Sequence, residues 1–83
     1  MNVTYRLDKD ILYIAMEGRI DASNAAEAEE KIFGIKNDNH GKHVVVDAEQ
    51  LEYISSAGLR VGLRLRKEDP KLAMKWAESR VWM

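Results

Sequence analysis

The chain has 83 residues, of which 46% are hydrophobic and 33% are charged, and this predicts one small folded domain over residues 1–83. Thirteen basic and fourteen acidic residues give a net charge of −1, whereas a general nucleic-acid binder would carry a basic excess. The lack of cysteine excludes disulfides, cysteine-based metal sites and a thiol nucleophile, and no apolar run is long enough for a signal peptide or a membrane span. We therefore expect a cytoplasmic protein with neither nucleic-acid nor membrane binding.

The first half of the chain predicts two strands and then a helix. Residues 3–7 alternate between apolar and polar side chains, as in a strand with one buried face, and residues 8–10 suit a tight turn. The denser apolar run 11–16 favours a strand covered on both sides, ended by Glu17-Gly18. Residues 19–24 are expected to be a loop that leads into a helix. The apolar stripe of that helix consists of Ala25, Ala28, Ile32 and Ile35.

The start of this helix offers several capping residues. Asn24 with Glu27 fits the reciprocal pattern in which the first side chain and the third helical residue cap each other. Asp21 or Ser23 could also cap.

The second half predicts a central strand, a helix and a last strand. Residues 43–47 are short and rich in valine, which favours a strand buried on both faces, and residues 48–53 are expected to be a connection. Residues 59–67 alternate as a strand would, but a helix that starts at Ser56 fits as well. We favour the helix, because serines precede it and Asp69-Pro70 can end it. It would bury Gly58, Val61, Gly62 and Leu65 and expose Arg60, Arg64 and Lys67.

Residues 71–77 alternate again and predict the last strand. The element order is then β-β-α-β-α-β. Strands joined through helices favour parallel pairing, whereas the first two strands form an antiparallel hairpin. The expected fold is α/β, with a small, mostly parallel or mixed sheet of about four strands and two helices.

Residues that could support catalysis or metal binding are few. His40 and His43 are three residues apart but have no acidic partner at a diagnostic spacing, so a turn residue and a strand residue are the plainer interpretation. Asp21 and Asp47 would approach each other if both ended strands at one sheet edge, but loop bonding and capping explain them more simply. We expect no enzyme activity, no cofactor and no metal site.

Ser55 and Ser56 lie where the central strand leads into the second helix. Free backbone N–H groups and the positive end of the helix dipole favour an anion there. A phosphoryl group on Ser56 would add about 1.5–2 negative charges at that point, and Arg60 follows one turn later. The simpler alternative is that Ser56 only caps the helix.

The stretch from Val44 to Arg60 resembles the signature of the anti-sigma-factor antagonist family, the STAS domain. In that family a strand ending in Asp leads through a short apolar loop to a serine-rich turn and a Gly-Leu pair at a helix start. Gly18-Arg19-Ile20-Asp21 resembles the loop that precedes the first helix of the family. The resemblance covers about residues 3–76.

This resemblance implies partner switching in the regulation of transcription. The protein would bind an anti-sigma factor that is also a serine kinase, and phosphorylation would break the complex until a PP2C-type phosphatase resets it. The phosphorylated serine of the family falls on Ser56, with Ser55 as the second choice because the family commonly has Asp there. The alternative is a scaffolding protein that keeps the fold but has lost the switch. The expected partner-binding residues are Asp21, Ser23, Asn24, Ser55, Ser56, Gly58, Arg60 and Arg64.

Members of the family usually continue past the last strand into another helix that covers the sheet, and this chain ends at Met83. Without that helix, Trp76 and Trp82 are expected to be exposed. An apolar surface of this kind favours self-association, so a homodimer through the C-terminal surface, or a domain-swapped form, is expected. The alternative is a chain truncated after the last strand, with reduced stability.

Overall fold

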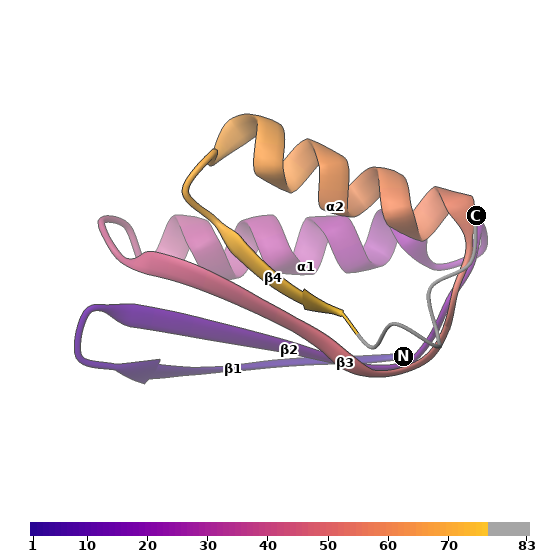
Figure 1. Cartoon of the computed structure of the whole chain (residues 1–83), viewed down its shortest axis with the longest axis horizontal. Helices are drawn as coiled ribbons and strands as arrows, with labels where there is room; N and C mark the ends of the chain where they lie inside the picture. Colours follow the sequence, from indigo (N-terminus) through magenta and orange to yellow (C-terminus); the bar gives the residue numbers. More distant parts are fainter. Residues whose placement is uncertain (77–83) are drawn as a thin grey trace.

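The computed structural model describes residues 1–76, apart from the side chains of Tyr53, Ile54 and Trp76. Over this range the chain is an α/β domain with the predicted order β-β-α-β-α-β (Figure 1). The tryptophan surface predicted to form a homodimer lies outside the described residues and side chains. The elements are β1 (Asn2–Asp8), β2 (Ile11–Ile20), α1 (Ala25–Asp38), β3 (His43–Ile54), α2 (Ser56–Glu68) and β4 (Ala73–Trp76).

The sheet is mixed, as predicted. Its strand order is β1-β2-β3-β4, with β1 antiparallel to β2 and the other described pairs parallel. Figure 1 shows α1 and α2 side by side on the same face of this sheet. The carboxyl ends of β2 and β3 therefore lead into α1 and α2 at the same end of the molecule.

Strands β2 and β3 are longer than predicted. The expected loop at Arg19-Ile20 and the expected connection at 48–53 are strand residues that continue the β2–β3 pairing. Two register shifts, at Ala15/Glu17 and at Gly18/Arg19, each insert one extra residue into β3. In β3 these bulges break the two-residue alternation from which a strand is recognised. The alternation of β2 continues to the buried Ile20, and this strand was predicted too short because Glu17-Gly18 was taken as its end.

The core lies on the helix side of the sheet, and the prediction of strands buried on both faces was wrong. On β2, Leu12 and Ile14 are fully buried under the helices, whereas Tyr13 between them is only half-buried. On β3, Val46 is fully buried and Val45 half-buried. Valine-rich runs favour strands in general, and the half-buried side chains show that the described part of the chain leaves the second face partly open.

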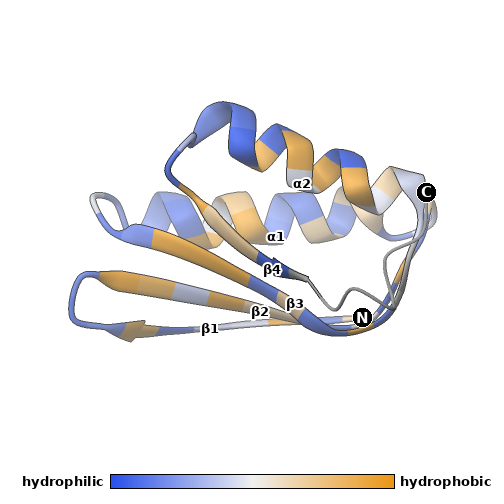
Figure 2. Cartoon of the chain, in the orientation of Figure 1, coloured by the Kyte–Doolittle hydropathy of each residue, from blue (hydrophilic) through white to orange (hydrophobic). Residues whose placement is uncertain are grey.

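The helix prediction for residues 59–67 is confirmed, and so is its orientation. The hydropathy colouring of α2 shows apolar and polar bands that repeat along the helix (Figure 2). The residues expected to be buried, Gly58, Val61, Gly62 and Leu65, face the core, and those expected to be exposed, Arg60, Arg64 and Lys67, are exposed.

Gly34 is an exposed residue inside α1, and a Cβ atom at this position would meet nothing within 4 Å. Glycine is less favourable than alanine in a helix interior by about 1 kcal/mol, so we expect Gly34→Ala to raise the free energy of unfolding by about that amount. Urea denaturation measures it. Gly18→Ala is the matched control, because its φ of +97° and a Cβ 3.2 Å from the Met1 Cα should make it destabilising. A loss of stability in Gly34→Ala would contradict the packing around α1.

Candidate partner-binding surface

The ends of β2 and β3 bring two of the predicted site segments together. Ile20 pairs with Ile54, and the Ser55 N–H donates to the Ile20 carbonyl at 2.9 Å. The loop that begins at Asp21 therefore lies beside the start of α2. The bulges in β3 contribute to this arrangement, because they set the register in which the two strands end together.

The loop over residues 21–24 is held by its own side chains. The Asp21 carboxylate accepts from the Ser23 N–H at 2.9 Å and from the Ser23 hydroxyl at 2.5 Å. Asn24 accepts from the Asp21 N–H through Oδ1 and donates to the Arg19 carbonyl through Nδ2. These bonds fix the loop against the end of β2.

The capping prediction for α1 is wrong in its side-chain detail. Asn24 occupies the N-cap position, but its side chain makes no bond to the helix and instead reaches back to the preceding residues. The backbone carbonyl of Asp21 accepts from the N–H groups of Asn24 and Ala25 in its place. The reciprocal pattern with Glu27 fails because Asn24 is needed to close the loop.

The hydrogen bonds from Ser23, followed by the nearby Arg19 charge, lower the pKa of Asp21 below its ordinary value of 3.8. A lowered pKa in the folded state means that ionised Asp21 stabilises the fold above pH 3.8 and that this contribution is lost as the pH falls through the folded pKa. We expect Asp21→Asn to be less stable than the wild type at neutral pH and the difference to shrink as the pH falls below 3.8. Urea titrations across this pH range measure it, and a difference independent of pH would contradict the loop geometry.

The two serines at the start of α2 have different environments. Ser55 is the half-buried N-cap residue, and its hydroxyl accepts from the Gly58 N–H at 3.5 Å. Ser56 is the first helical residue and is exposed. The Ser55 side chain is therefore turned towards the helix backbone, whereas Ser56 is accessible to another protein.

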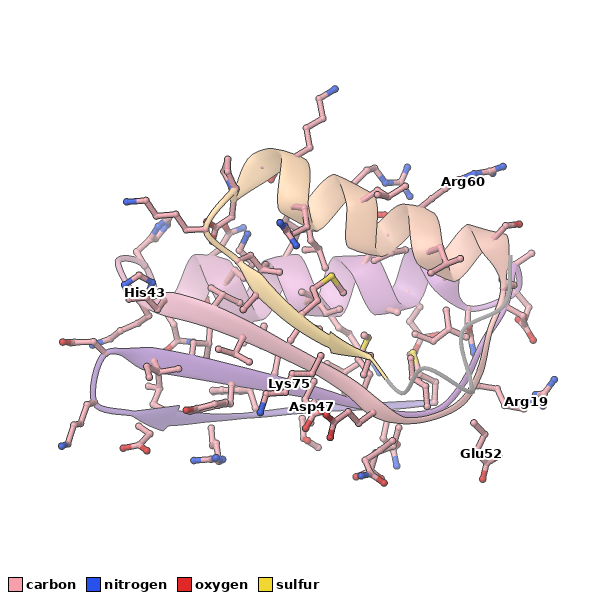
Figure 3. The ribbon with its side chains drawn as sticks, in the orientation of Figure 1. Arg19, His43, Asp47, Glu52, Arg60 and Lys75 are labelled. Carbon is pink, nitrogen blue, oxygen red and sulfur yellow. The ribbon has the colours of Figure 1, made fainter. Side chains whose placement is uncertain are left out.

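The two arginines of α2 also differ. The Arg60 side chain extends away from the sheet into solvent (Figure 3). Arg64 pairs with Glu29 of α1, with 2.5 Å between Nη2 and Oε2, and so ties the two helices together. Both arginines border an open groove of about 520 Å³ between α1 and α2, which is also lined by Ala22, Ala26 and Phe33.

The carboxylates considered as an acid–base pair are not brought together. Asp47 pairs with Ala15 in the middle of the sheet, whereas Asp21 follows Ile20 at its end. Five residues of β2 separate these levels, which is roughly 16 Å along a strand. Among residues 1–76, no cluster of three or more metal-ligating side chains is found, and no helix is long and apolar enough to cross a membrane.

Comparison with models of protein families tests the resemblance to the STAS domain that the motifs indicated. The family model of the STAS domain matches residues 2–76. The chain belongs to the STAS domain family. No curated protein matches it.

Solved structures of anti-sigma factor antagonists share the fold at low sequence identity. An anti-sigma factor antagonist from Mycobacterium paratuberculosis superposes with a TM-score of 0.72 at 19% identity, over 90% of this chain and 64% of that chain. The STAS domain of an anti-sigma factor antagonist from Rhodobacter sphaeroides superposes with a TM-score of 0.62 at 18% identity, over 94% of this chain and 86% of that one. The present chain thus spans less than two thirds of the Mycobacterium protein.

The residues predicted to bind a partner lie where β2 and β3 lead into the helices and, for Arg60 and Arg64, further along α2. Ser23, Ser56, Arg60 and Arg64 are exposed, and Asp21, Asn24 and Ser55 are half-buried beside them. Gly58 is the exception, because it is buried and can only support the surface from below. Sequence reasoning missed the groove residues of α1, since their pattern indicates only that they lie away from the core. These residues include Ala26, Glu30 and Phe33.

Proposed function

We propose that this STAS domain is an anti-sigma factor antagonist that acts by partner switching in the cytoplasm. In its unphosphorylated form it would bind an anti-sigma factor that is also a serine kinase. Phosphorylation of Ser56 would end this complex, and a PP2C-type phosphatase would restore it. The observation that supports the proposal best is the exposed position of Ser56 at the first residue of α2, beside the loop of Asp21.

The domain itself can accommodate a phosphate on Ser56. The first N–H groups of α2 have no partner within the helix, and the helix dipole places positive charge there. Arg60 lies four residues later and is exposed, so it can approach the same anion. A dianion would therefore leave the fold intact.

A docked partner cannot accommodate the same phosphate easily. Docking removes water from the start of α2, and an unpaired charge buried in an interface is costly. Acidic side chains of the partner would add like-charge repulsion. Phosphorylation would therefore dissociate the complex without unfolding the domain.

Calorimetric titration with candidate anti-sigma serine kinases from the same organism tests the proposal. We expect a stable complex without ATP and a loss of binding after incubation with ATP. A complex that survives phosphorylation would favour the scaffolding alternative. The absence of any complex with the cognate kinase would contradict the proposed function.

The basic side of α2 should contribute to this affinity. We expect the double charge reversal Arg60→Glu/Arg64→Glu to weaken kinase binding by at least about tenfold, since reversed charges meet the same partner surface. Arg6→Glu/Lys71→Glu changes the net charge equally at exposed positions on β1 and before β4, and it should bind normally. Equal affinities for the two double variants in the same titration would refute a role for this face.

A further inference from the structure

One face of α2 points away from the core and combines basic residues with an exposed leucine. Ser56, Arg60, Leu63 and Lys67 follow at steps of four, three and four residues, which places them on one stripe of a helix. All four are exposed, whereas Val61 and Leu65 face the core. We call Ser56, Arg60, Leu63 and Lys67 the outer stripe of α2.

Leu63 is the unusual member of the outer stripe. Its exposed fraction is 69%, against 53% for Tyr5 and 49% for Leu7, the other large exposed hydrophobic residues among those described. A single exposed leucine is ordinary on a protein surface. Leu63, however, follows Leu59 by one turn, and Leu59 is half-buried, so the two form a small apolar surface on α2.

The surroundings of Leu63 are basic. Arg60 and Lys67 lie one turn before and one turn after it on the same stripe, and Arg66 is also exposed on this helix. The first turn of α2 carries no acidic residue. An apolar side chain framed by positive charge is complementary to an apolar pocket with a negative border.

We propose that Leu63 is the anchor through which this STAS domain binds its anti-sigma kinase, an inference that rests on the proposed function. Leu63 would enter an apolar pocket of the kinase. Carboxylates at the border of that pocket would pair with Arg60 and Lys67. A few well-buried residues carry most of the affinity of an interface, and a leucine loses less side-chain entropy on burial than a long charged residue does.

The same arrangement couples the anchor to the switch. Ser56 lies seven residues before Leu63 on the outer stripe, which is roughly 10 Å along the helix axis. A phosphate on Ser56 would thus face the negative border that attracts Arg60 and Lys67. The negative border that attracts the outer stripe of α2 would therefore repel the same helix once Ser56 carries a phosphate.

Titration of Leu63→Ala and Leu7→Ala against the cognate kinase tests the anchor. Both variants remove an exposed leucine, and circular dichroism checks that both are folded. We expect Leu63→Ala to bind about ten- to a hundredfold more weakly and Leu7→Ala to bind as the wild type does. Affinity should also fall as salt is raised, because the rim contacts are ionic.

The outcomes separate the anchor from the proposed function. If the wild type binds and phosphorylation releases it, but Leu63→Ala binds within twofold of the wild type, the anchor is refuted and the switch stands. If the wild type does not bind the kinase at all, both are refuted. Weakening by Leu7→Ala to the same extent as Leu63→Ala would also overturn the assignment, since it would mean a loss common to all exposed leucines.

Discussion

Replacing Ser56 with aspartate is expected to weaken binding to the anti-sigma kinase by about a hundredfold, which corresponds to about 2.7 kcal/mol. The new carboxylate would stand at the exposed first residue of α2, where the partner is proposed to dock. It carries one negative charge, fewer than a phosphate, so phosphorylation itself should have the larger effect. Calorimetric titration of each variant into the kinase measures the difference.

Ser55→Asp is the matched control, because it adds the same charge one residue earlier. Ser55 is the N-cap, and aspartate caps a helix as well as serine does, so its carboxylate should turn towards the Gly58 N–H. We expect this variant to bind within a few-fold of the wild type. If Ser55→Asp abolished binding and Ser56→Asp did not, the assignment of the switch to Ser56 would be wrong.

Leu65→Ala should lower the free energy of unfolding by about 2–5 kcal/mol. Leu65 is fully buried in the core between α2 and the sheet, and truncation removes packed methyl groups and leaves a cavity. A domain of this size has a small stability reserve, so a large fraction of it would be lost. Urea denaturation followed by circular dichroism measures the change.

Leu63→Ala is the control on the same helix, two residues away. Its side chain is 69% exposed, and substitutions at such positions usually change stability by less than about 0.5 kcal/mol. A strand over residues 59–67 would place both leucines on one face, whereas the helix places them on different faces. Equal destabilisation by the two variants would therefore contradict α2 as described.

The helices were predicted from the sequence more accurately than the strands, both in their bounds and in their buried faces. The buried set of α2 followed from spacing alone, because a regular helix has one period from end to end. The end of β3 could not be predicted, since each bulge shifts its alternation by one residue and leaves no local signal. The end of β2 was placed too early because Glu17-Gly18 was taken as a stop, although the alternation continues to Ile20. Likewise, the valines of β3 indicated a strand but not which of its faces the helices cover.

The candidate site was predicted in outline. The motifs placed Asp21 and Ser56 at the ends of elements, but their proximity depends on the pairing of Ile20 with Ile54, a long-range contact that spacing does not reveal. The Asn24 side chain was misassigned for the same reason, because its partner, the Arg19 carbonyl, belongs to a strand end predicted as loop. The exposure of Leu63 could be assigned only when the face of α2 that packs against the core was known.

The most direct test of the switch is to incubate the protein with its cognate kinase and ATP and to locate the modification by tandem mass spectrometry. We expect a single phosphoryl group on Ser56, the release of the kinase at the same rate as phosphorylation, and neither change in Ser56→Ala. A phosphoryl group on another residue, or a phosphorylated Ser56 in a protein that stays bound to the kinase, would contradict the account.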